Sequence, residues 1–130
     1  MKLALSAVMA VASLAASAPQ TLAAPGPRSA QQCFRISQME GHRVADNRTL
    51  YVGAGRSDVY RLDMSGACLA GASRSDPLVV ESTAGSNVVC GPLDINLRLA
   101  DSGGGPSCII KHITRLTPDE VAALPPNLKP

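Results

Sequence analysis

The chain has 130 residues, of which 45% are hydrophobic and 2% aromatic, and its 12 basic and 10 acidic side chains give a net charge of +2. This length suits one small domain. The near balance of charge and the scarcity of aromatic side chains, which are Phe34, Tyr51 and Tyr60 alone, argue against a nucleic-acid-binding surface.

Residues 1–23 predict a secretory signal peptide. Lys2 is the only charged residue before Arg28, and the apolar stretch from Leu3 to Leu14 is shorter than a membrane-spanning helix requires. Small residues follow, and we expect cleavage after Ala23, ahead of a disordered polar leader at residues 24–32. The alternative is an uncleaved anchor, which the short apolar run disfavours. We therefore expect a periplasmic or secreted protein with no stable membrane insertion once the signal is removed.

Residues 33–130 are expected to form a single domain that contains all four cysteines, Cys33, Cys68, Cys90 and Cys108. Their wide spacing includes no Cys-x-x-Cys pair, which argues against a zinc site or a thioredoxin-like redox site. An even number of cysteines in an exported chain predicts two structural disulfides. The sequence leaves all three pairings open, and we favour Cys68 with Cys90 and Cys33 with Cys108.

The first half of the domain predicts short strands. Residues 33–37 alternate apolar and polar side chains, as a half-buried strand does. Residues 38–48, which contain Gly41, are expected to form a loop. Residues 49–52 and 58–64 predict a hairpin around a glycine-bearing turn, and the second of these strands should point its larger apolar side chains inward.

The second half continues the pattern. Residues 78–82 and 88–90 predict another hairpin, and residues 94–99 a strand with Ile95, Leu97 and Leu99 inward. After a glycine-rich turn at 102–106, residues 108–113 predict a last strand, in which Ile110 and Ile113 have opposite parity, so that a bulge between them is needed to bury both.

A short helix near 118–124 is predicted by a Thr-x-x-Glu capping box, with Thr117 as the N-cap and Glu120 three positions later. Six or seven short strands with frequent turns indicate a mainly β fold. We expect a small antiparallel sheet curled into a barrel or sandwich, with one C-terminal helix and two disulfides.

Catalytic motifs are not found, and we expect no cofactor and no metal site. Glu40 and His42 are expected to be a solvated pair in a loop, His112 a buried and hydrogen-bonded histidine, and Asp46 a turn former. The candidate binding residues are five arginines that could share one exposed sheet face: Arg48, Arg56, Arg61, Arg74 and Arg98. Asp46, which lies near Arg48 in the sequence, is a further candidate. The simpler interpretation of the arginines is a genomic preference for arginine codons.

Several short runs resemble a family of small exported proteobacterial proteins known only as a domain of unknown function. The runs are Cys33–Ile36, Asp46 ahead of Thr49–Val52, Tyr60–Leu62 leading to Cys68–Leu69, Val89–Asp94 and Cys108–Ile110. The resemblance covers about residues 32–117, and the cysteine frame is its most specific part. It implies a periplasmic or secreted single-domain protein and supplies no catalytic residues.

The leading functional hypothesis is a non-enzymatic binding domain of the bacterial envelope that takes a protein or a small ligand. One alternative is a small hydrolase with a site near His42 and Asp46. Another is a secreted enzyme inhibitor that inserts the loop at residues 101–107 into its target.

Overall fold

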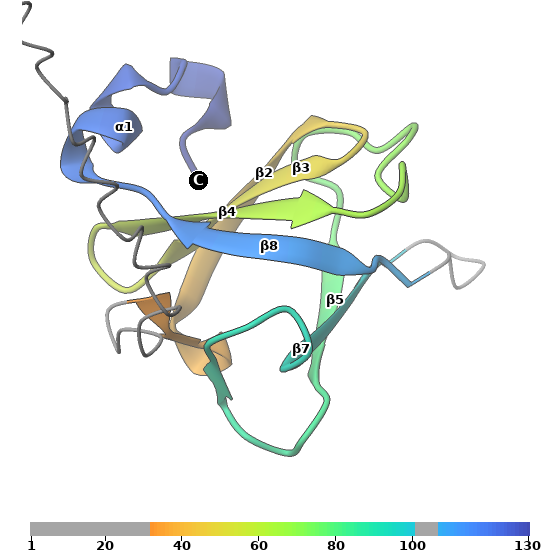
Figure 1. Cartoon of the computed structure of the whole chain (residues 1–130). Helices are drawn as coiled ribbons and strands as arrows, with labels where there is room; N and C mark the ends of the chain where they lie inside the picture. The colour runs from red at the N-terminus through yellow and green to blue at the C-terminus, as the bar shows by residue number, and fades with distance from the viewer. Residues whose placement is uncertain (1–31, 101–106) are drawn as a thin grey trace, which may run out of the picture.

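The computed structural model describes residues 32–100 and 107–130 (Figure 1). The predicted signal peptide, the leader up to residue 31 and residues 101–106 of the proposed inhibitory loop lie outside the described residues.

One layer of the fold is a four-stranded antiparallel sheet with the strand order β2-β3-β4-β8. Its strands are β2 (Met39–Asp46), β3 (Thr49–Ala54), β4 (Asp58–Met64) and β8 (Ile110–Arg115). The first three follow each other through tight turns, and β8 returns from far along the chain to pair with β4. Gly55, in the turn before β4, has a φ of 66°, a conformation that favours glycine.

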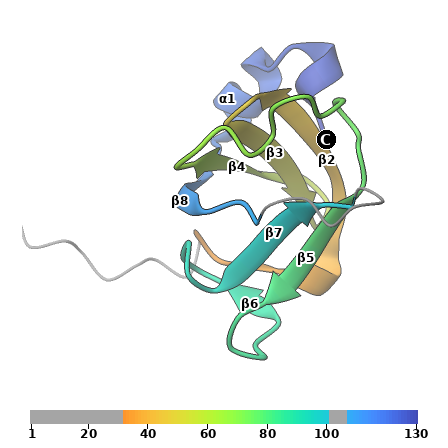
Figure 2. The same ribbon diagram turned by 90° about the vertical axis from the view of Figure 1, so that its right-hand side faces the viewer.

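Two strand pairs form the second layer. β5 (Leu78–Ser82) pairs with β7 (Ile95–Leu99), and β1 (Phe34–Arg35) pairs with β6 (Val88–Val89), both antiparallel. Figure 2 shows β5, β6 and β7 on one side of the four-stranded sheet and α1 (Pro118–Ala123) on the other. The sheets do not close into a barrel, so the mainly β fold expected from the sequence takes the form of a small sandwich.

The core lies between the two layers and follows from the alternation of side chains along each strand. Leu50, Val52 and Leu62 of the large sheet are fully buried, and Ile95 and Leu97 of β7 meet them from the other layer with exposures of 4% and 1%. The predicted inward faces of β4 and β7 are therefore confirmed, although Leu99 is only partly buried.

The two disulfides are Cys33–Cys90 and Cys68–Cys108, so the pairing favoured from the sequence is wrong. Cys33 and Cys90 flank the paired strands β1 and β6, which brings their Cα atoms to 4.2 Å. Cys68 follows β4 and Cys108 precedes β8, the partner of β4, with a Cα separation of 5.4 Å. Strand pairing, which the spacing of cysteines does not encode, selects the bridges.

The segment expected to be a loop at residues 38–48 is instead mostly the edge strand β2. Irregular register between Met39 and Gly41, and again between Val44 and Asp46, breaks the apolar alternation that would have marked it as a strand. Only Val44 of this strand is fully buried, because β2 lies at the edge of the sheet. The strand expected at 33–37 is shorter than predicted, since a 3₁₀ turn, η2 (Ile36–Gln38), follows Arg35.

The predicted hairpin between residues 78–82 and 88–90 does not form. β5 extends its pairing to β7, with Val80 opposite Leu97, while β6 pairs with β1 and is held there by the Cys33–Cys90 bridge. β6 and β7 are both short and apolar, so the local sequence pattern does not show which of them pairs with β5.

The bulge predicted between Ile110 and Ile113 is confirmed. Met64 pairs with Ile110 and Asp63 with His112, which leaves Lys111 as an extra residue in β8. The shift turns Ile113 toward Leu62 in the core and turns His112 outward, so His112 is exposed and the expectation of a buried histidine is wrong.

The predicted helix is confirmed as α1, with its complete capping box between Thr117 and Glu120. None of its residues is fully buried. A second 3₁₀ turn, η3 (Pro126–Leu128), follows, and Pro130 lies against Gly41 and Gly53, where a Cβ at Gly41 would come within 3.3 Å of Pro130. The C-terminal segment thus covers part of the outer face of the large sheet, the face turned away from the second layer.

Candidate functional site

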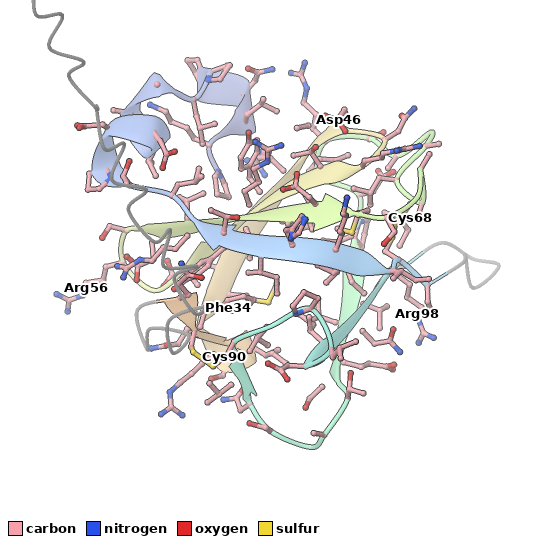
Figure 3. All side chains as sticks on the ribbon, in the orientation of Figure 1. Phe34, Asp46, Arg56, Cys68, Cys90 and Arg98 are labelled. Atoms are coloured by element: carbon pink, nitrogen blue, oxygen red, sulfur yellow. A yellow bond between two sulfur atoms is a disulfide. The ribbon has the colours of Figure 1, made fainter. Side chains whose placement is uncertain are left out.

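The arginines proposed from the sequence are not gathered on one sheet face. Arg48 lies in the β2–β3 turn and Arg56 in the β3–β4 turn, at opposite ends of β3. Arg98 belongs to β7 in the other layer, 3.4 Å from Glu81, and Figure 3 shows it far from Arg56. Of the proposed set, Arg61 alone lies on the outer face within a strand of the large sheet.

Asp46 closes the β2–β3 turn, as its sequence context predicts. Its carboxylate accepts a hydrogen bond of 2.8 Å from the backbone N–H of Arg48. That hydrogen bond is the main reason that the pKa of Asp46 is lowered from its ordinary value. The carboxylate is therefore engaged in holding the turn.

The candidate hydrolytic residues Glu40, His42 and Asp46 all belong to β2 rather than to a loop. An extended strand rises about 3.3 Å per residue, which separates the Cα atoms of His42 and Asp46 by about 13 Å. His42 is half-buried and donates from Nε2 to the carbonyl oxygen of Asp76 at 2.8 Å. The fold therefore does not bring these three groups together in one cleft.

A cavity of about 650 Å³ lies beside Gln32, where β8 passes into α1. Its volume is within the range of small-molecule sites, which is about 300–1,000 Å³. Polar and apolar side chains contribute to its wall, which is formed by Gln32, Ser57, Asp58, Arg115, Leu116, Thr117, Pro118 and Val121.

An ion pair forms the charged part of this cavity. Nη2 of Arg115 donates to Oδ1 of Asp58 at 2.6 Å, and the two side chains keep 36% and 39% of their surface exposed. The hydrogen bond that Arg115 donates to Asp58 is the main cause of the raised pKa of Arg115. A negative and a positive group thus stand side by side at the edge of the cavity, each with part of its surface exposed.

Tyr60 fixes the strand that carries Asp58. Its ring packs on Phe34 with a centroid distance of 4.8 Å, and its hydroxyl donates to the carbonyl oxygen of Cys33 at 3.0 Å. Burial raises the pKa of Tyr60, and the nearby charge of Asp58 raises it further. Tyr60 therefore connects the strand that carries Asp58 to Cys33, which is bridged to Cys90.

A second cavity of about 490 Å³ adjoins the first and shares Ser57, Asp58 and Val121 with it. Its remaining wall includes the glycines under Pro130 and the charged side chains of Glu40, Arg56 and Lys129. Val121 of α1 thus stands between two hollows, which explains why a helix that caps the sheet buries none of its residues.

Sequence reasoning missed Asp58 and Arg115, which are 57 positions apart. One signal was present. In β4, Asp58 alternates in step with the inward-facing residues Tyr60 and Leu62. In β8, Arg115 alternates in step with Ile113. Each is therefore a charged residue on the inward side of a strand, near its end. A charged residue with inward parity is a candidate for pairing with an opposite charge.

Metal binding has no support among residues 32–100 and 107–130, where no three histidine, cysteine or acidic side chains cluster closely enough to hold an ion. Within the same residues, no helix has the length and apolar character needed to cross a membrane.

These features define a small disulfide-linked β-sandwich with a ligand-sized cavity beside its terminal helix. Comparison with protein families shows that the chain belongs to a family of unknown function, DUF6491, whose model matches residues 1–129. The resemblance to a family of unknown function noted in the sequence is thereby confirmed. Neither the curated proteins nor the solved structures contain a match.

Proposed function

We propose that the protein is an exported binding domain of the bacterial envelope and that it holds a small ligand in the cavity at Asp58 and Arg115. Export is supported by the charge and apolar pattern of residues 1–23. It is also supported by the two disulfides, which suit an oxidising compartment such as the periplasm or the exterior.

The observation that carries the binding function is the composition of the cavity wall. Opposite charges stand 2.6 Å apart, Ser57 brings an uncharged hydrogen-bonding group beside them, and Val121 supplies an apolar surface. Ligand sites typically combine a mostly apolar wall with a few convergent polar groups.

The adjacent opposite charges indicate a zwitterionic ligand. A carboxylate on the ligand can accept hydrogen bonds from the guanidinium of Arg115, and an ammonium beside it can donate to Asp58. A ligand with a single charge meets one complementary and one like charge at the same place. The apolar wall of Leu116, Pro118 and Val121 then favours an α-amino acid with an aliphatic side chain.

The test is an NMR titration of the disulfide-bonded protein with three probes of similar shape. L-leucine carries both charges, 4-methylpentanoate lacks the ammonium, and 3-methylbutylamine lacks the carboxylate. We expect leucine to bind most tightly and to shift the amide signals of Ser57, Asp58 and Thr117. Failure of leucine to shift these signals at millimolar concentration contradicts the proposed site.

Two variants test the charge assignment. Asp58→Asn should weaken leucine binding about tenfold or more and leave the binding of 4-methylpentanoate unchanged or stronger. Arg115→Gln should weaken the binding of both leucine and 4-methylpentanoate. Each substitution removes a charge-assisted hydrogen bond to the ligand group of opposite charge. The matched control is Arg98→Gln, which removes an arginine from a comparable exposed ion pair outside the cavity. Circular dichroism and thermal melting confirm folding. Equal binding of leucine and 4-methylpentanoate to the native protein contradicts the zwitterion assignment.

A further inference from the structure

The outer face of the large sheet carries one aligned row of polar side chains. Arg43 of β2 lies opposite Tyr51 of β3, Tyr51 opposite Arg61 of β4, and Arg61 opposite Thr114 of β8. We call these four residues the arginine–tyrosine row. Their sequence neighbours Val44, Leu50 and Leu62 are buried in the core, so the alternation of each strand turns the row outward.

The row is open to a partner. The side chain of Arg61 is 47% exposed, Thr114 is exposed, and Tyr51 and Arg43 are half-buried. Toward the β3–β4 turn, the adjacent positions are Gly41, Gly53 and Val59, where Pro130 lies on the two glycines and Val59 is only 7% exposed. Pro130 therefore covers the positions of β2 and β3 that lie next to the row.

Hydrogen bonds hold both arginines in place. Nη1 of Arg43 donates to the carbonyl oxygen of His42 at 2.7 Å, and Nε of Arg61 donates to Asp63 at 2.9 Å. Adjacent strands are about 4.8 Å apart, so the backbones that carry the two arginines are about 10 Å apart with Tyr51 between them. Two positive groups thus flank one of the chain's three aromatic rings.

We propose that the arginine–tyrosine row is a docking surface for an acidic polypeptide segment of a partner protein. Arginine and tyrosine are enriched among the residues that dominate protein–protein binding energies, and their positive charges complement carboxylates. The row lines neither of the two cavities described above, which suits a macromolecule better than a small ligand. The near balance of 12 basic and 10 acidic side chains in the chain argues against a nucleic acid as the occupant.

The experiment measures fluorescence anisotropy of a labelled oligoglutamate peptide with the disulfide-bonded protein, at low and at physiological salt. We expect binding that weakens with salt, because exposed charges are screened. The double variant Arg43→Gln/Arg61→Gln should weaken binding about tenfold or more, and Tyr51→Leu, which leaves the charge unchanged, should weaken it several-fold. The charge-matched control is Arg56→Gln/Arg98→Gln, which should change binding less than about twofold.

Three outcomes overturn the proposal. One is an equal loss in the two double variants, which indicates attraction by net charge alone. Another is that single-stranded DNA binds as tightly as oligoglutamate and loses affinity to the same extent in Arg43→Gln/Arg61→Gln. That result assigns the surface to nucleic acid. The third is no effect of Tyr51→Leu. Leucine binding in the cavity is expected to be unaffected by Arg43→Gln/Arg61→Gln, so failure here is distinguishable from failure of the proposed cavity function.

Discussion

The hydroxyl of Tyr60 donates a hydrogen bond of 3.0 Å to the carbonyl oxygen of Cys33, the residue directly before β1. The side chain of Tyr60 is almost completely buried, and the cysteine is bridged to Cys90. One hydrogen bond therefore connects the central strand β4 with the disulfide-bonded strands β1 and β6.

Removing this hydrogen bond should lower the free energy of unfolding. In Tyr60→Phe the ring keeps its packing on Phe34, but the carbonyl of Cys33 loses its donor, and we expect a loss of about 1 kcal/mol. Urea denaturation measures the change. Tyr51→Phe is the matched control, since Tyr51 lies on the half-exposed outer face, and a loss as large in the control contradicts the assigned role.

The ionisation of Tyr60 should occur above the ordinary tyrosine pKa of about 10. The unfolded chain ionises near that value, so the stability contributed by the neutral ring is complete below about pH 10 and is lost as the pH rises through the folded-state pKa. In Tyr51→Phe, Tyr60 is the only tyrosine, and the ultraviolet absorbance of its phenolate reports the titration directly. A midpoint at or below about 10 in the folded protein contradicts the prediction.

The disulfide bonds should map as Cys33–Cys90 and Cys68–Cys108 in peptides obtained without reduction. The bridged residues are 57 and 40 positions apart, and the chain-entropy relation gives about 4 kcal/mol of stabilisation for each bridge. Replacing either pair by serine should lower the free energy of unfolding by an amount of that order. Recovery of a peptide that links Cys33 to Cys108 is the contradicting result.

Deleting Lys111 should be tolerated, with a loss of less than about 1 kcal/mol in the free energy of unfolding. Lys111 is the extra residue of the bulge, so its removal leaves Ile110 and Ile113 two positions apart, and both can face the core of a regular strand. Lys111→Ala keeps the extra residue and should change stability by less than about 0.5 kcal/mol. Thermal or urea unfolding of the two variants makes the comparison. A loss of about 2–5 kcal/mol on deletion, which is the cost of losing a buried isoleucine, contradicts the assignment of Lys111 as the extra residue.

Acid should weaken the β2–β3 turn through Asp46. The pKa of Asp46 is lowered in the folded state, so its contribution is present above the unfolded pKa of about 3.9 and is lost as the pH falls through the lower folded value. Asp46→Asn retains a side-chain oxygen and does not titrate, so its unfolding free energy should fall less steeply below about pH 4. Urea unfolding at neutral and acidic pH measures the difference, and parallel pH profiles contradict it.

Local chemistry in the sequence determined much of this protein. Alternation placed Tyr60, Leu62 and Leu97 in the core, the capping box of Thr117 and Glu120 defined the helix, and the clashing parity of two isoleucines revealed the bulge. Each of these features depends on residues a few positions apart, which is the range over which strand and helix periodicity acts.

Tertiary structure alone decided which distant segments meet. It paired β5 with β7 and Cys33 with Cys90, turned an irregular polar segment into the edge strand β2, and brought Asp58 to Arg115. Many short apolar strands can pair equally well by pattern, and the choice among them depends on packing of the whole core. The candidate site falls in this second group, because its charged pair and its cavity exist only where the ends of β4 and β8 meet α1.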